Sequence, residues 1–72
     1  MKWHKADTGH YVTEDGRFEI LKGYSRVFGN CWILFDNSET DYYAMQIAHE
    51  YTLREAKAKA EGIVKQENNN EM

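Results

Sequence analysis

The strongest constraint on the fold lies in residues 52–64, which carry the pattern of a helix with a defined start. Thr52 and Glu55 have the spacing of a capping box, in which a hydroxyl and a carboxylate satisfy amides at the helix N-terminus. Behind this start, apolar residues recur at helical spacing and form one narrow stripe: Leu53, Ala56, Ala60 and Ile63. A helix with a single apolar stripe covers a partner surface, and the rest of the chain is expected to form a sheet beneath it.

Two strands of that sheet are predicted around an Asp-Gly turn. Residues 9–14 and 17–22 are rich in β-forming residues, and Asp15-Gly16 between them indicates a two-residue type I′ turn. The register that follows from this turn directs one set of side chains to the core: Tyr11, Thr13, Phe18 and Ile20. The opposite face is mixed and carries His10, Val12, Glu19 and Leu21.

A third strand is predicted over residues 31–35, which are apolar on both faces and suit the most buried position in a sheet. Gly29-Asn30 is the expected turn before it, and would place Phe28 opposite Cys31. Gly23 is expected to mark a bend or bulge in the second strand.

Residues 39–51 allow two interpretations, an extended segment or short edge strand, and an early helical turn. The extended interpretation is preferred because the capping box at Thr52 implies a new helix start there. The predicted fold is therefore α+β, a three-stranded antiparallel sheet (β-β-β) packed on one C-terminal helix. Residues 1–65 form this single domain, and residues 66–72 form a disordered polar tail.

One helix covers only one face of such a sheet, so the other face is left with apolar side chains. It would carry Val12 and Leu21 with one of two sets from the third strand, either Trp32 and Leu34 or Cys31, Ile33 and Phe35. Exposed apolar patches on small domains mark interaction surfaces, although the loop and tails would also be able to wrap this one. We expect either a protein partner or a homodimer formed through this face.

The stretch Ser38–Tyr43 combines acidic residues with two adjacent tyrosines, which suits a basic protein partner, the alternative being a plain solvated loop. The candidate partner-binding residues are therefore Val12, Leu21, Trp32, Leu34, Asp41, Tyr42 and Tyr43.

The residue types that carry catalysis or hold metals are sparse and badly spaced. Cys31 is the single cysteine, which excludes an internal disulfide. His4, His10 and His49 lack the spacing of a zinc site, and no carboxylate lies in an apolar context that would raise its pKa. The sequence predicts a non-enzyme without a metal or cofactor.

The net charge of −3 and the pI of about 5.5 argue against binding to phosphate backbones. A nucleic-acid-binding regulator remains the alternative, with Arg17, Lys22 and Arg26 as candidate contacts on the second strand, but interleaved acidic residues favour solvated strand charges. No apolar run is long enough for a signal peptide or a membrane span, so a soluble cytoplasmic protein is expected.

Several motifs together resemble a known group of sequences. They are Trp3, Gly-x-Tyr-x-x-Glu-Asp-Gly-Arg-Phe-Glu-Ile at 9–20, Trp-x-Leu-x-Asp at 32–36 and Thr-Leu-Arg-Glu-Ala-Lys-Ala-x-Ala-Glu at 52–61. The pattern resembles small proteins of unknown function that are common in bacteriophages and prophages. The resemblance implies three strands and a helix in a bacterial host cytoplasm, and no activity. The acidic, tyrosine-bearing segment at 37–51 departs from it.

A weaker similarity is to the N-terminal arm-type DNA-binding domains of tyrosine integrases, which also place an Asp-Gly-Arg-aromatic hairpin before a sheet and a C-terminal helix. Those domains read DNA with the sheet and are basic, whereas this chain is acidic. The leading hypothesis is a phage or prophage accessory protein that binds another protein, such as a host factor. A structural dimer within a larger phage assembly is a third option.

Overall fold

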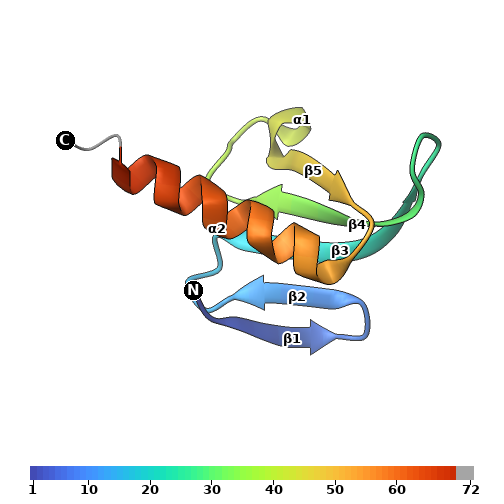
Figure 1. The fold of residues 1–72 in the computed structure, drawn as a ribbon, viewed down its shortest axis with the longest axis horizontal. Helices are drawn as coiled ribbons and strands as arrows, with labels where there is room; N and C mark the ends of the chain where they lie inside the picture. Colours follow the sequence, from blue (N-terminus) through green and yellow to red (C-terminus); the bar gives the residue numbers. More distant parts are fainter. Residues whose placement is uncertain (70–72) are drawn as a thin grey trace.

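The computed structural model of the protein describes residues 1–69, which form an antiparallel sheet with one long helix packed on it (Figure 1). The strands lie in the sheet in their order along the chain, so each strand pairs with the one before it. The strands are β1 (Trp3–Asp7), β2 (His10–Thr13), β3 (Phe18–Ser25), β4 (Gly29–Asp36) and β5 (Gln46–Glu50). The helices are α1 (Tyr42–Met45) and α2 (Leu53–Asn69).

The fold is α+β as predicted, but the prediction of a three-stranded sheet was wrong, because the sheet has five strands. The two strands outside the predicted three, β1 and β5, are the edges, and β5 lies in the segment that was expected to be extended or a short edge strand. Every residue of β1 after Trp3 is exposed, so this strand lacks the alternation of apolar and polar residues that reveals a half-buried strand. It is held by pairing with β2, which places Trp3 opposite Thr13.

Segment 39–51 contains both of the structures that were considered for it. Asp41 accepts a hydrogen bond from the Tyr43 amide at 3.0 Å and caps the single turn α1. The chain then extends as β5, which pairs with β4 so that His49 lies opposite Ile33. The extended interpretation therefore holds for the second half of the segment and the helical alternative for part of the first.

The first hairpin has the predicted register, with Tyr11 opposite Ile20 and Val12 opposite Glu19, but its turn is not type I′. That turn type needs a positive φ at Asp15, and within the described residues no residue other than glycine has one. Gly16 takes the left-handed conformation with φ of 79°, and its amide donates to the Thr13 carbonyl at 2.9 Å. The Asp15 carboxylate closes the turn by accepting from the Arg17 amide at 3.0 Å.

The prediction for the second hairpin was wrong. Its loop is residues 26–28, and Cys31 lies opposite Gly23 rather than Phe28. The Ser25 hydroxyl accepts from the Val27 and Phe28 amides at 3.1 and 3.3 Å, which stabilises the loop in place of a Gly-Asn turn. The resulting register shift is an odd number of residues, so it decides which side chains of β4 face the helix. No bulge occurs at Gly23, which pairs with Cys31 inside the continuous ladder of β3 and β4.

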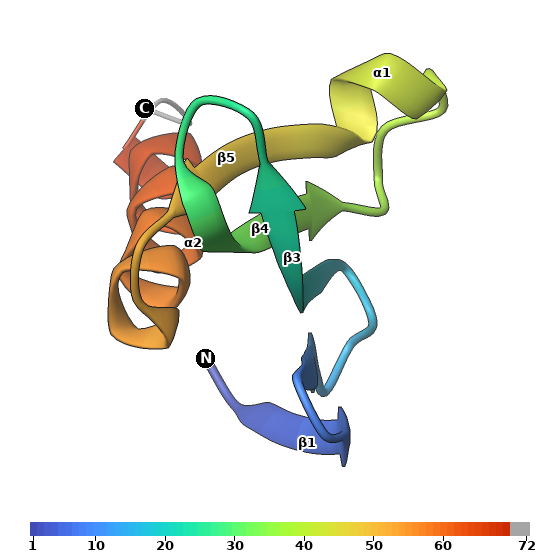
Figure 2. The same cartoon turned by 90° about the vertical axis from the view of Figure 1, so that its right-hand side faces the viewer.

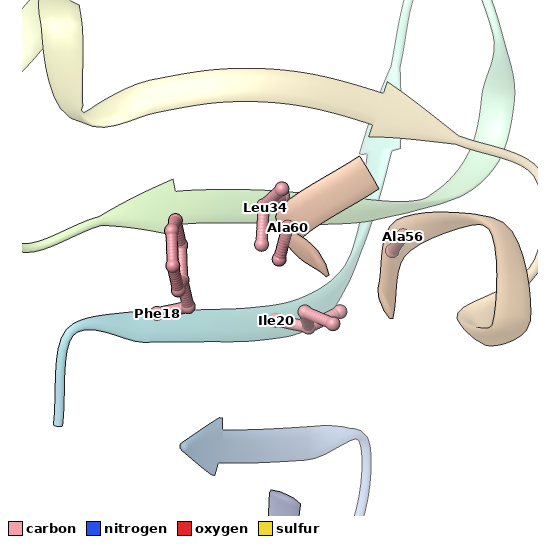
Figure 3. Close-up of a cluster of buried hydrophobic side chains, with 5 residues drawn as sticks. All are labelled: Phe18, Ile20, Leu34, Ala56 and Ala60. Carbon is pink, nitrogen blue, oxygen red and sulfur yellow. The ribbon is translucent and has the colours of Figure 1, made fainter. Parts of the chain in front are cut away.

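The core lies between α2 and one face of the sheet, and it is formed as the apolar stripe predicts. Ala56 and Ala60 are completely buried against Phe18, Ile20 and Leu34 (Figure 3). Partly buried side chains extend this cluster: Trp3, Tyr11, Trp32, Ile47, Ala48, Leu53, Ile63 and Val64. The small alanine side chains let the helix backbone lie close to the sheet.

The start of α2 is confirmed, whereas its end differs from the prediction. The Thr52 hydroxyl accepts from the Glu55 amide at 3.1 Å and donates to the Glu55 carboxylate at 2.9 Å. The helix continues through Gly62 to Asn69, so residues 66–69, expected to begin a disordered tail, are helical. The rest of that expected tail, residues 70–72, lies outside the described residues.

Candidate protein-interaction face

The face of the sheet opposite α2 carries a group of partly buried apolar side chains, and we call this surface the open face. Its centre consists of Val12, Leu21, Ile33 and Phe35. The register places Leu21 beside Ile33 on neighbouring strands, and Glu19 between Val12 and Phe35. Figure 2 shows α2 on the other side of the sheet, so the helix shields none of these side chains.

All three histidines of the chain belong to this same face. His4, His10 and His49 lie directly opposite Val12, Leu21 and Ile33 in the ladder. Directly opposed residues point to the same side of a sheet. The open face therefore combines an apolar centre with three imidazole side chains.

Glu19 is a carboxylate near the centre of the open face, and two neighbouring side chains hold it in place. It accepts a hydrogen bond from the Asn37 amide group at 2.8 Å, and His10 Nε2 lies 2.8 Å from its other oxygen. The bond from Asn37 and then that from His10 lower the pKa of Glu19, outweighing the opposite effect of burial. Glu19 is therefore charged at neutral pH and fixed in orientation.

An aromatic corner closes one end of the open face. Phe28, from the loop between β3 and β4, stacks on His49 with a centroid distance of 6.0 Å and an interplanar angle of 5°. It also meets Tyr51 edge-on at 5.4 Å. Phe28 and Tyr51 remain 38% and 61% exposed, so the corner is accessible to a partner.

The acidic and aromatic stretch adjoins the open face at its β5 edge. Figure 2 shows α1 on the side of the sheet away from α2. Tyr42 and Tyr43 of α1 pack edge-to-face at 5.6 Å, yet they are 74% and 86% exposed. Glu39 and Asp41 lie just before them and are also exposed.

Two of the candidate partner-binding residues lie elsewhere. Leu34 is completely buried beneath α2, and Trp32 is on the same face, where it packs edge-on against Tyr11 at 6.0 Å. Of the two sets considered for the third strand, Cys31, Ile33 and Phe35 point to the open face. Cys31 is only 2% exposed, so Ile33 and Phe35 are the accessible members. Only the register of the hairpin between β3 and β4 decides which of the two sets faces α2. The turn expected from the sequence at this hairpin is not the one that forms.

The three candidate nucleic-acid contacts lie in different settings. Arg17 is bound to two carboxylates, with bonds of 3.1 and 3.2 Å to Asp36 and two of 2.7 Å to Glu67. Lys22 lies on the α2 side of the sheet, 5.8 Å above the Trp32 ring. Arg26 is in the exposed loop between β3 and β4.

Arg17 instead joins the sheet to the last turns of α2. Glu67 and then Asp36 raise the pKa of its guanidinium above the usual value. Burial raises the pKa of Asp36, but hydrogen bonds from Arg17 and Ser38 outweigh it, so the net pKa is lowered. Asp36 is 5% exposed, and this buried carboxylate is therefore stabilised as an ion.

The described residues hold no group of three or more His, Cys, Asp or Glu side chains arranged to bind a metal ion. Neither helix within residues 1–69 is long and apolar enough to cross a membrane.

Comparison with protein families, with curated proteins and with solved structures found no match for this chain. The function is therefore inferred from the chemistry of the surface itself.

Proposed function

We propose that the chain is a small phage or prophage accessory protein that binds another protein through the open face in the bacterial cytoplasm. The observation that carries this proposal is the single helical layer: α2 covers one face of the sheet and leaves Val12, Leu21, Ile33 and Phe35 accessible on the other. The phage setting rests on the resemblance of the sequence motifs.

The free energy gained by burying the apolar centre indicates how strongly this face would bind a partner. Full burial of one such side chain contributes roughly 1.5–3 kcal/mol, and these four are already partly buried, so together they would add about 3–6 kcal/mol. Association costs about 4–15 kcal/mol in lost translational and rotational freedom. The apolar centre alone would therefore hold a partner weakly, and contacts at the border of the face are needed for a stable complex.

The chemistry of the face supports binding rather than catalysis. A general acid working at neutral pH needs a raised pKa, whereas the pKa of Glu19 is lowered. Its two oxygens are already engaged with His10 and Asn37. The buried thiol of Cys31 is not accessible to a substrate.

The test compares two variants in affinity capture from the bacterial host lysate. Val12→Thr combined with Leu21→Thr makes the open face more polar and places β-branched threonines, which favour strands, at both positions. Lys5→Thr is the matched control, because Lys5 lies opposite Tyr11 and is exposed on the other side of the sheet.

The double variant is expected to lose the captured protein, and the control to retain it. Circular dichroism and the Tm would establish that both variants fold. Capture of the same protein by both variants, in equal amounts, would contradict a role of the open face.

A further inference from the structure

We propose that the occupant of the open face is an amphipathic helix of another protein that carries Lys or Arg beside its apolar side. This inference rests on the proposed function and specifies the chemistry of the partner. The apolar side of the helix would lie on Val12, Leu21, Ile33 and Phe35, and its cations would meet the tyrosine pair and acidic residues next to α1.

The shape of the apolar centre fits one helix. Its side chains come from the three adjacent strands β2, β3 and β4. Strands lie about 4.8 Å apart, so the strip is about 10 Å wide. An α-helix with its side chains has a diameter of about 10–12 Å. A peptide that added as a further strand would instead pair with β1 or β5 at an edge and leave this strip uncovered.

The charge around the open face favours a cation. Segment 36–50 carries Asp36, Glu39, Asp41 and Glu50, and it contains no Lys or Arg. Asp36 is neutralised by Arg17. Glu39 and Asp41 are exposed and make no ion pair within residues 1–69. Glu19 adds a further negative charge on the face itself.

The aromatic residues support the same conclusion independently. Elsewhere in this molecule cations lie over aromatic rings, with Lys57 5.0 Å from the centroid of Tyr11 and Arg17 4.7 Å from that of Phe18. Within the described part of the chain, Tyr42 and Tyr43 have no such cation and are largely exposed. A pair of exposed rings beside carboxylates is a suitable receptor for Lys or Arg.

A second copy of the chain fits this surface less well. A two-fold pairing would bring together two faces with the same acidic border, and like charges oppose association. Nucleic acid is disfavoured for the same reason, because its phosphates would approach carboxylates.

The test uses two synthetic 18-residue helical peptides that share one Leu and Ala face. One carries Lys on its polar side and the other carries Glu. Each is titrated into the ¹⁵N-labelled protein, and amide shifts report both the site and the Kd. The Lys peptide is expected to shift amides of β2 to β4 and of α1, and to bind at least about tenfold more tightly than the Glu peptide.

Variants identify the cation receptor. Tyr42→Ser with Tyr43→Ser, and separately Glu39→Gln with Asp41→Asn, should each weaken the Lys peptide roughly three- to tenfold. Asn remains a good N-cap, so the second variant keeps α1. The controls are Tyr24→Ser, at an exposed tyrosine of β3, and Glu61→Gln, on the exposed side of α2, and both should leave the Kd unchanged.

The outcomes separate this inference from the proposed function. Equal binding of both peptides at the open face would overturn the cationic partner and leave protein binding intact. Shifts confined to other surfaces, or no shifts with either peptide, would overturn the helical occupant. A concentration-dependent dimer in sedimentation that buries the open face would replace it with a second copy. Only unchanged capture by the Val12→Thr, Leu21→Thr variant counts against the proposed function.

Discussion

At the scale of single residues, Arg17 joins three parts of the molecule. Its guanidinium binds Asp36 at the end of β4 and Glu67 near the end of α2, while it lies over the ring of Phe18. In the alternative hypothesis Arg17 was a candidate nucleic-acid contact, because a charged strand residue gives no sign in the sequence of its distant partners. Glu67 is 50 residues away and was expected in a disordered tail.

Arg17→Met should destabilise the fold by roughly 2–3 kcal/mol, because it leaves the nearly buried Asp36 carboxylate without its cation. Urea unfolding at neutral pH measures the loss. Glu67→Gln is the control and should cost less, since Glu67 is on the exposed side of the cluster and Asp36 keeps its partner. Equal losses for the two variants would show that Asp36 does not depend on Arg17.

Stability should fall in acid because the pKa values of Asp36 and Glu19 are lowered in the folded state. A lowered pKa contributes stability that is fully present above the pKa of the unfolded chain and lost as the pH falls through the folded value. The loss should therefore begin below about pH 4–5, the range of unperturbed carboxyl groups.

The urea midpoint at pH 3 should thus be below that at pH 7, and the difference should be smaller in Arg17→Met. A midpoint that is independent of pH over this range would contradict the role of these carboxylates.

At the scale of elements, the sequence predicted the parts that have strong local signals. The capping residues and apolar stripe of α2 lie close together in the sequence, so the helix is predictable from local pattern. The register of the first hairpin is likewise set by the residues of its own turn. The edge strand β1 depends on pairing with β2, which its own residue pattern does not indicate, whereas β5 was expected as an extended segment or short edge strand. The loop of the second hairpin is stabilised by two hydrogen bonds that the Ser25 hydroxyl accepts, and the glycine pattern in the sequence does not indicate them.

The candidate site was predicted in part for the same reason. Val12 and Leu21 were assigned to the uncovered side from a turn whose register held, and they lie there. Trp32 and Leu34 were assigned without a reliable register for β4, and they face α2.

The close approach of α2 to the sheet makes its alanines intolerant of larger residues. Ala60→Leu should destabilise the protein by about 1–3 kcal/mol, since Ala60 is completely buried against the sheet and the added atoms would force the helix away. Thermal unfolding provides the measurement. Ala58→Leu, on the exposed side of the same helix, should be nearly neutral, and a similar loss there would point to an effect of leucine other than packing.

At the scale of the whole molecule, the two faces of the sheet differ in chemistry as well as in cover. The α2 side holds the core and the ion pairs of Arg17, whereas the open face holds every histidine of the chain.

The order of the strands has a consequence for how the chain acquires its structure. Each strand hydrogen-bonds to the one synthesised just before it, so the sheet can grow strand by strand as the polypeptide leaves the ribosome. The segment that protects Phe18, Ile20 and Leu34 from water is made only after all of the strands. Until this segment docks, both faces of the nascent sheet expose apolar side chains to water. During this interval the chain is most prone to aggregate or to need a chaperone.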